Sequence, residues 1–168
     1  TGKYQTRDIS ITIQEVKETI EKTGIGLFRF AGSTTPVSLS NRIADALLTE
    51  GLHIEYSMFI RAESKAQERL PELVECYEKI IRSGLRAVFL GVEAANNVVL
   101  SKIMDKGGSV EDMYFTVKAI KQASYNQKIH LDVGVSFIYP CPIPPDSGIT
   151  HEQILEENLH LLQKLKNE

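Results

Sequence analysis

Polar side chains end two apolar segments of this sequence, and a run of small residues follows a third. Arg61 ends HIEYSMFIR, and Glu93 ends RAVFLGVE. The small residues of AGSTTP, among them Gly32 and Ser33, follow GLFRF. A guanidinium binds carboxylates, a carboxylate binds ammonium groups or ribose hydroxyls, and small residues leave backbone N–H groups accessible. These groups together suit a zwitterionic ligand that also carries hydroxyl groups.

Each of these residues also has an ordinary structural explanation. Arg61 and Glu93 could pair with each other across neighbouring strands, and AGST could be a plain turn between a strand and a helix. Asn96, three residues after Glu93, is suited to the N-cap of the helix that follows. The four histidines lack metal-ligand spacing, and Cys76 and Cys141 do not form a CxxC pair. We therefore expect no metal site in this chain.

The elements that must position these residues alternate along the chain. Four apolar runs predict strands at residues 26–31, 53–62, 86–93 and 130–139. Apolar residues at helical spacing predict helices at residues 12–24, 40–51, 67–84, 109–123 and 150–165. Strands that alternate with helices form parallel sheets. Right-handed crossovers then place the carboxyl ends of all strands on one side, where ligands bind in such folds.

Length and element order predict one α/β domain that spans residues 1–168. A chain of 168 residues is most simply built around a single core. A helix comes first, so the first βα unit lacks its strand. Four or five units are also too few for an eight-unit barrel, which needs about 250 residues. We expect an open parallel sheet with helices outside, either a partial, TIM-like (β/α) barrel or a doubly wound sheet.

Smaller features of the pattern predict helix ends and core positions. Thr12 and Glu15 have the spacing of a capping box for the first helix, and Gly24 is placed to end it. Thr150 is placed to cap the last helix. The methionine and phenylalanine residues of the strands are expected in the core: Met58, Phe59, Phe89 and Phe137.

Composition argues against several classes of partner. The 22 acidic residues outnumber the 19 basic ones, the formal net charge is −3, and the basic residues are scattered. Nucleic-acid binding needs clustered lysine and arginine, so none is expected. No segment approaches the ~20 apolar residues of a membrane span, and the first residues lack the apolar stretch of a signal peptide. We expect a cytoplasmic protein.

The segment RSGLRAVFLGVEAANNVVLSKIMDKG resembles the fourth-strand segment of radical S-adenosylmethionine (radical SAM) enzymes. The family pattern is a helix end with glycine, an apolar strand, GxES and a downstream Lys-Gly pair. Gly84, residues 91–94 and Lys106–Gly107 occupy those positions here. VKETIEKTGIGLFRFAGST, LHIEYSMFIRAE and HLDVGVSFIYPCPIPPDS are similar to other strand segments of the family. The nearest subgroup contains the cobalamin-dependent and methylthiotransferase-like members.

This resemblance implies a partial barrel with S-adenosylmethionine at the carboxyl ends of the strands. Gly32 and Ser33 would face the methionyl amino group of the cofactor. Arg61 and Glu93 would bind its polar methionyl and ribose parts. The adenine would lie near the backbone of three consecutive residues, Phe137, Ile138 and Tyr139. In the family, a 4Fe–4S cluster delivers the electron that cleaves the cofactor to a 5′-deoxyadenosyl radical.

The chain departs from the family pattern in three places. It has no CxxxCxxC motif, whose three thiolates hold the cluster, and Cys76 and Cys141 cannot replace them. Ala94 stands where serine is common, and Tyr139 and prolines replace the glycines of the fifth-strand pattern. We expect a fragment of a longer radical SAM enzyme, with the 4Fe–4S cluster in the full-length protein only. The isolated chain is then inactive, and its substrate cannot be predicted.

Two other functions stay open. The chain could be a natural, cluster-free barrel that binds the cofactor or serves as a scaffold. It could also be an unrelated partial-barrel lyase that uses Arg61 and Glu93 on a carboxylate substrate. In each case the strand at 26–31 has a free edge, because no strand precedes it. Free edges pair with other chains, so we expect self-association there.

Overall fold

Helices and strands alternate along the chain, as the sequence pattern predicts. The computed structural model describes residues 6–167, apart from the side chain of Ser33. The helices are α1 (Ile9–Thr23), α2 (Val37–Thr49), α3 (Leu70–Arg82), α4 (Asn97–Lys102), α5 (Val110–Gln127) and α6 (His151–Lys166). The strands are β1 (Leu27–Thr35), β2 (Glu55–Ile60), β3 (Leu85–Glu93) and β4 (Asp132–Phe137). None of these helices has both the length and the apolar character that crossing a bilayer demands.

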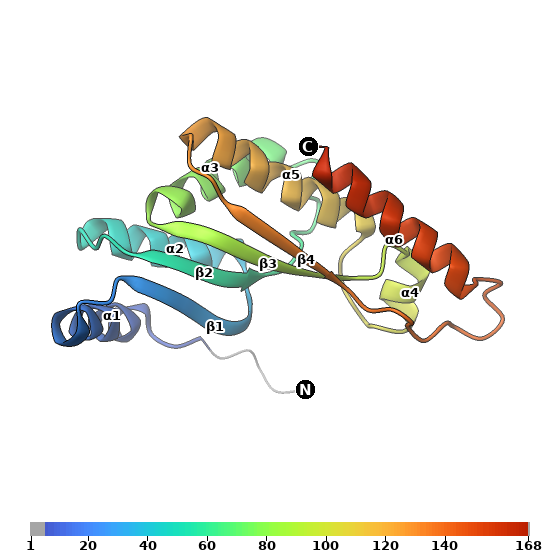
Figure 1. Cartoon of the computed structure of the whole chain (residues 1–168), viewed down its shortest axis with the longest axis horizontal. Coiled ribbons are helices and arrows are strands. Elements are labelled where there is room, and N and C mark those ends of the chain that lie inside the picture. Colours follow the sequence, from blue (N-terminus) through green and yellow to red (C-terminus); the bar gives the residue numbers. More distant parts are fainter. Residues whose placement is uncertain (1–5, 168) are drawn as a thin grey trace.

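The four strands form one parallel sheet in the order β1-β2-β3-β4 (Figure 1). Outside the sheet, α1 contacts α2, α2 contacts α3, α3 contacts α5, and α5 contacts α6. The predicted α/β fold, an open parallel sheet with helices outside, is confirmed. The helices gather on one face of the sheet, as in a partial barrel, whereas a doubly wound sheet carries helices on both faces.

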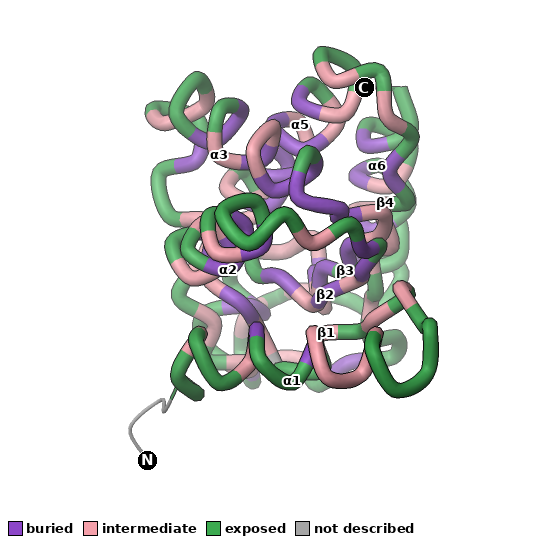
Figure 2. The backbone as a smooth tube through the Cα atoms, turned by 90° about the vertical axis from the view of Figure 1, so that its left-hand side faces the viewer, coloured by how far each residue is buried: buried purple, intermediate pink, exposed green. Residues whose placement is uncertain are grey.

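The core lies between the sheet and this helical layer. Along β2 the buried side chains of Tyr56, Met58 and Ile60 alternate with the partly exposed Ser57 and Phe59. Strands alternate in this way because successive side chains point to opposite faces of a sheet. Figure 2 shows buried residues on the strands and on the helices that cover them. The opposite face, called the open face below, is covered by no helix among residues 6–167.

The helix ends follow the predicted capping signals, with one correction. Asp8, rather than Thr12, is the N-cap of α1, and its carboxylate accepts a hydrogen bond from the Ser10 N–H at 2.8 Å. Thr12 lies inside the helix, where its hydroxyl donates to the Asp8 carbonyl oxygen at 3.1 Å. Gly24 ends α1 in the left-handed conformation, and Thr150 caps α6, both as predicted.

β1 is longer than predicted, because the small-residue segment continues the strand. Between the pairs Phe30–Met58 and Thr35–Ile60, β1 advances five residues while β2 advances two. Residues 31–34 therefore bulge out of the ladder before pairing resumes at Thr35. The small residues predict a turn from their local preferences, but pairing with β2 overrides those preferences.

Candidate functional site

A cavity of about 420 Å³ lies on the open face at the carboxyl ends of the strands. Ligand pockets of parallel α/β folds have this position and this size. The cavity contains both Arg61 and Glu93, so the structure brings together the two charged residues that the sequence singles out. A smaller cavity of about 330 Å³ adjoins it and shares four lining residues with it: Thr34, Arg61, Gly91 and Lys106.

Glu93 ends β3 in a tight turn. Its φ of 66° lies in the left-handed region, and the Ala94 N–H donates to the Val92 carbonyl oxygen at 2.9 Å, which closes a three-residue γ-turn. The carbonyl oxygen of Glu93 accepts a hydrogen bond from the Ile138 N–H at 2.8 Å, so the turn is tied to the chain after β4. A non-glycine residue in this conformation carries strain on the order of 1–3 kcal/mol. Contacts around Glu93 must therefore hold it there.

Lys106 supplies the strongest of these contacts. Its ammonium group donates to Glu93 Oε1 at 2.7 Å and to the Gly91 carbonyl oxygen at 2.8 Å. Gly91 leaves the space for this arrangement, because a β-carbon there would lie 2.5 Å from Glu93 Oε1. The Glu93 side chain is 22% exposed and that of Lys106 is 35% exposed. No described residue donates a hydrogen bond to Glu93 Oε2, so this oxygen can accept one from a ligand.

α4 and the loop after it bring Lys106 back to the end of β3. Asn96 is the N-cap of α4, and its Oδ1 accepts hydrogen bonds from two backbone N–H groups at 3.0 and 3.1 Å. The structural explanation of Asn96 is thus confirmed. After α4, Asp105 adopts a φ of 47°, and the Lys106 N–H donates to the Leu100 carbonyl oxygen at 3.0 Å. The loop conformation therefore fixes the lysine beside the carboxylate.

Arg61 directly follows β2 and lines both cavities. It is exposed and forms no hydrogen bond or ion pair with any described residue. The alternative of an Arg61–Glu93 ion pair is wrong, since Glu93 pairs with Lys106. The chain beyond Arg61 is anchored, because the Glu63 N–H donates to Thr116 Oγ1 at 3.0 Å. An unpaired guanidinium on an anchored segment is available for the carboxylate of a ligand.

The bulged end of β1 forms another wall of the site. Thr34 lines both cavities. Gly32 is exposed, and a β-carbon added to it would come no closer than 3.8 Å to the rest of the protein, at Thr35 Oγ1. The side chain of Ser33 lies outside the described part of the structure. Gly32 and Ser33 therefore remain predicted cofactor contacts.

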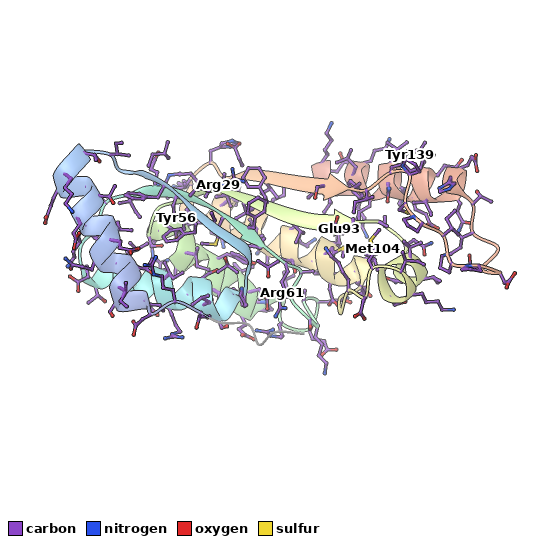
Figure 3. The ribbon with its side chains drawn as sticks, turned by 90° about the horizontal axis from the view of Figure 1, so that it is seen from below. Arg29, Tyr56, Arg61, Glu93, Met104 and Tyr139 are labelled. Carbon is purple, nitrogen blue, oxygen red and sulfur yellow. The ribbon has the colours of Figure 1, made fainter. Side chains whose placement is uncertain are left out.

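The chain after β4 holds the other predicted residues. The Ile138 N–H donates to Glu93, so the backbone here adjoins the site. The side chains contact other parts of the protein: Phe137 packs against the main core, and the ring of Tyr139 meets His151 edge-on, with centroids 6.3 Å apart. Figure 3 shows Tyr139 beyond Glu93 at this end of the sheet. A contact with adenine through this backbone remains a prediction.

Two aromatic residues predicted in the core are instead part of the cavity. Phe59 and Phe89 line it from the open face, and Phe89 is 39% exposed. Lys106 is the other residue whose place in the site the sequence does not predict. One signal in the sequence points to Lys106: it belongs to the Lys-Gly pair that resembles the pair downstream of the fourth strand in radical SAM enzymes.

A further cavity of about 520 Å³ lies between α5 and α6, in the outer helical layer. Tyr114 and Lys164 line it, with the lysine ammonium 3.9 Å from the centroid of the tyrosine ring. This groove lies in the outer helical layer and not on the open face, where Arg61 and Glu93 meet at the carboxyl ends of the strands. The strand-end cavity is therefore the better candidate site.

The described residues do not fit a 4Fe–4S cluster. Such a cluster needs cysteine thiolates from several positions, and residues 6–167 contain no group of three potential metal ligands. Cys76 lies on α3, where its sulfur accepts a hydrogen bond from Asn41 Nδ2 at 2.9 Å. Cys141 is buried in a small apolar cluster with residues of α4 and α6. Neither cysteine lines the strand-end cavity.

The chain is similar in structure to the cobalamin-dependent S-adenosylmethionine radical enzyme OxsB. With aqua-cobalamin bound, that enzyme matches 92% of this chain with a TM-score of 0.67 and 16% sequence identity. With aqua-cobalamin and S-adenosylmethionine bound, the TM-score is 0.65. The two proteins share a fold. This chain spans 22% of the length of OxsB. No protein-family model matches the chain, and no curated protein matches it in sequence.

A protein of Burkholderia cenocepacia J2315 described as a phosphonomutase is also similar. It matches 97% of this chain and 63% of its own length, with a TM-score of 0.52 and 11% identity. Proteins with different chemistry thus share this arrangement of helices and strands. Because a fold alone does not determine a reaction, the functional conclusion depends on the residues of the site.

Proposed function

We propose that this chain is the core of a radical SAM enzyme and that it binds S-adenosylmethionine in the strand-end cavity. One observation carries the proposal: Lys106 and Gly91 fix the Glu93 carboxylate in the cavity that the unpaired guanidinium of Arg61 also lines. S-adenosylmethionine combines a zwitterionic methionyl group with ribose hydroxyls, and these are the groups that an arginine and a carboxylate bind. The likeness to OxsB, an enzyme whose structure includes bound S-adenosylmethionine, supports the same ligand.

Each wall of the cavity then binds one part of the ligand. Arg61 binds the methionyl carboxylate, and Glu93 accepts hydrogen bonds from the ribose hydroxyls at Oε2. Lys106 acts through Glu93, because it holds the carboxylate in the γ-turn geometry. The backbone at Gly32 and Ser33 accommodates the amino group, and the backbone after β4 lies along the adenine.

Cleavage of the cofactor to a radical requires an electron from an iron–sulfur cluster, and the described residues do not fit one. We therefore assign the cluster to another part of a longer protein. The span of 22% relative to OxsB is in keeping with a larger whole enzyme. The isolated chain accordingly binds the cofactor and does not cleave it.

Isothermal titration calorimetry of the chain with S-adenosylmethionine tests this proposal. Glu93→Gln and Arg61→Gln each remove a charge-assisted hydrogen bond worth about 1.5–3 kcal/mol, so each lowers the affinity roughly tenfold to hundredfold. Arg82→Gln is the matched control, because Arg82 is an exposed arginine in the last turn of α3. Equal affinities in all four proteins, or no binding by any of them, would contradict the proposed site.

The lack of cluster ligands among the described residues favours one second candidate, a barrel that binds the cofactor without catalysis. Both candidates require the same binding site. They differ in the longer protein, which produces 5′-deoxyadenosine under reducing conditions only if it is a radical enzyme. Analysis of that product by chromatography separates the two.

A further inference from the structure

A second cationic group, the exposed Arg29, lies on the open face, nearer the amino ends of the strands than the strand-end cavity. The guanidinium carbon of Arg29, on β1, is 4.9 Å from the ring centroid of Phe59 and 5.6 Å from that of Phe89. The two rings lie 5.5 Å apart with an interplanar angle of 40°. Figure 3 shows Arg29 further toward the amino ends of the strands than Arg61 and Glu93. Arg29, Phe59 and Phe89 thus form one cluster, called the Arg29 cluster below.

The register of the strands places Arg29 one side-chain layer below the rings that line the strand-end cavity. Arg29 is paired with Ser57, one side-chain layer below Phe59 on the same face of β2. Phe59, Phe89 and Gly134 are paired in a row across β2, β3 and β4, and all three line the strand-end cavity. The rings therefore form the floor of the cavity, and the guanidinium lies against them from below.

The ring of Phe89 packs closely against β4 at Gly134. A β-carbon on Gly134 would lie 2.8 Å from Cδ1 of Phe89, so the ring can take this position only because residue 134 has no side chain. Stacking of a guanidinium on aromatic rings restrains its position while leaving its N–H edge free. A group fixed in this way loses less conformational entropy when it binds a ligand.

The charge of Arg29 is not neutralised by the described residues, with which it makes no hydrogen bond or ion pair. Two acidic residues on its face, Glu55 and Asp132, contact other side chains. Glu55 pairs with Arg86 Nε at 3.1 Å, and Asp132 Oδ1 lies 3.1 Å from His130 Nε2. An arginine held against an apolar floor without a counter-ion is suited to an oxyanion, either a carboxylate or a phosphate.

We propose that the Arg29 cluster is a substrate subsite for an oxyanion attached to a planar or apolar group. The oxyanion binds the N–H edge of Arg29, and the apolar part of the ligand contacts Phe59 and Phe89 at the floor of the cavity. That this ligand is a substrate rests on the proposed function, in which the cofactor occupies the strand-end cavity above Arg29. The binding of the oxyanion itself does not depend on that function.

Nuclear magnetic resonance of the ¹⁵N-labelled chain tests the subsite with three probes: phenyl phosphate, benzoate and the uncharged benzyl alcohol. We expect phenyl phosphate or benzoate to shift the backbone amide signals of Arg29, Ser57 and Phe89 in a saturable way. Benzyl alcohol binds at least tenfold more weakly if the charge matters. The anion that binds more tightly identifies the substrate group as a phosphate or a carboxylate.

Substitutions test whether Arg29 and the aromatic rings bind these anions. Arg29→Gln weakens anion binding roughly tenfold or more, and Arg29→Lys, which keeps the charge but loses the planar stack, gives an intermediate loss. Phe89→Leu keeps the charge and removes part of the floor, so it also weakens binding and serves if Arg29→Gln does not fold. Arg82→Gln leaves binding unchanged. Equal anion affinity in Arg29→Gln and the unsubstituted chain, or no saturable shift with either anion, overturns the subsite.

The same variants separate this inference from the proposed function. Arg29→Gln keeps its affinity for S-adenosylmethionine, whereas Arg61→Gln loses it. If the chain binds the anions through Arg29 but does not bind S-adenosylmethionine, the proposed function fails and the anion subsite stands. If Arg61→Gln abolishes anion binding and Arg29→Gln does not, the proposed subsite is wrong and the anions bind beside Arg61 in the strand-end cavity.

Discussion

Replacement of Gly91 by alanine gives a sharp test of how the site is built. A β-carbon at this position would lie 2.5 Å from Glu93 Oε1 and 3.3 Å from Lys106 Nζ. Both atoms are the ends of flexible side chains, so the backbone of β3 need not move. The carboxylate has to leave its position over Gly91, and its hydrogen bond with Lys106 is lost or rearranged.

The expected effects on stability and on binding are very different in size. A partly exposed ion pair contributes about 0–1 kcal/mol to folding, and Gly→Ala at a compatible position returns about 0.4–1 kcal/mol through the unfolded chain. We therefore expect the free energy of unfolding of Gly91→Ala to change by less than about 1 kcal/mol. Binding of S-adenosylmethionine loses an oriented carboxylate, which is worth about 1.5–3 kcal/mol, or roughly tenfold to hundredfold in affinity.

Urea denaturation and calorimetric titration with S-adenosylmethionine measure the two quantities on one preparation. Gly26→Ala is the matched control, because a β-carbon at Gly26 would make an ordinary contact of 3.8 Å with the His53 carbonyl oxygen. This control should keep both its stability and its affinity. Undiminished affinity in Gly91→Ala would refute the role of the fixed carboxylate. A large loss of stability would show that Gly91 serves the fold instead.

Three further predictions concern the fold. Asn158 is 5% exposed and its Oδ1 accepts a hydrogen bond from the Ala95 N–H at 2.7 Å, so Asn158→Leu should cost about 1–3 kcal/mol in thermal unfolding. Burial raises the pKa of Tyr56 to about 12 and raises that of Tyr77 as well. Because these phenols are neutral in the folded protein, their contribution to the free energy of unfolding should be constant below pH ~10 and fall as the pH rises toward 12. Urea denaturation at several pH values measures this fall, which should be shallower in Tyr56→Phe. Self-association through the edge strand β1 should weaken in Leu27→Lys, since Leu27 is 70% exposed, and sedimentation of both proteins at several concentrations measures it.

Much of the architecture follows from the sequence because the alternation of strands and helices is regular. Strands that end in Arg61 and Glu93 meet at one edge of a parallel sheet whatever the details of their loops. Helix ends are also local properties, so the caps at Asn96 and Thr150 follow from a few neighbouring residues. The meeting of the two charged residues in one cavity could therefore be predicted.

Other features depend on contacts that a local pattern does not contain. β3 is apolar on both faces, so its sequence cannot tell that Phe89 faces the open side. Lys106 reaches Glu93 only through the conformation of the loop after α4, including the positive φ of Asp105. The extension of β1 to Thr35 depends on pairing with β2, which overrides the turn preference of small residues.

A crystal structure of the chain with S-adenosylmethionine tests the central claim most directly. We predict the ligand in the strand-end cavity, with its methionyl carboxylate on the Arg61 guanidinium and its ribose hydroxyls on Glu93 Oε2, while the Glu93–Lys106 ion pair persists. Density for the ligand in the groove between α5 and α6, or a strand-end cavity that stays empty at a saturating ligand concentration, would contradict the proposed function.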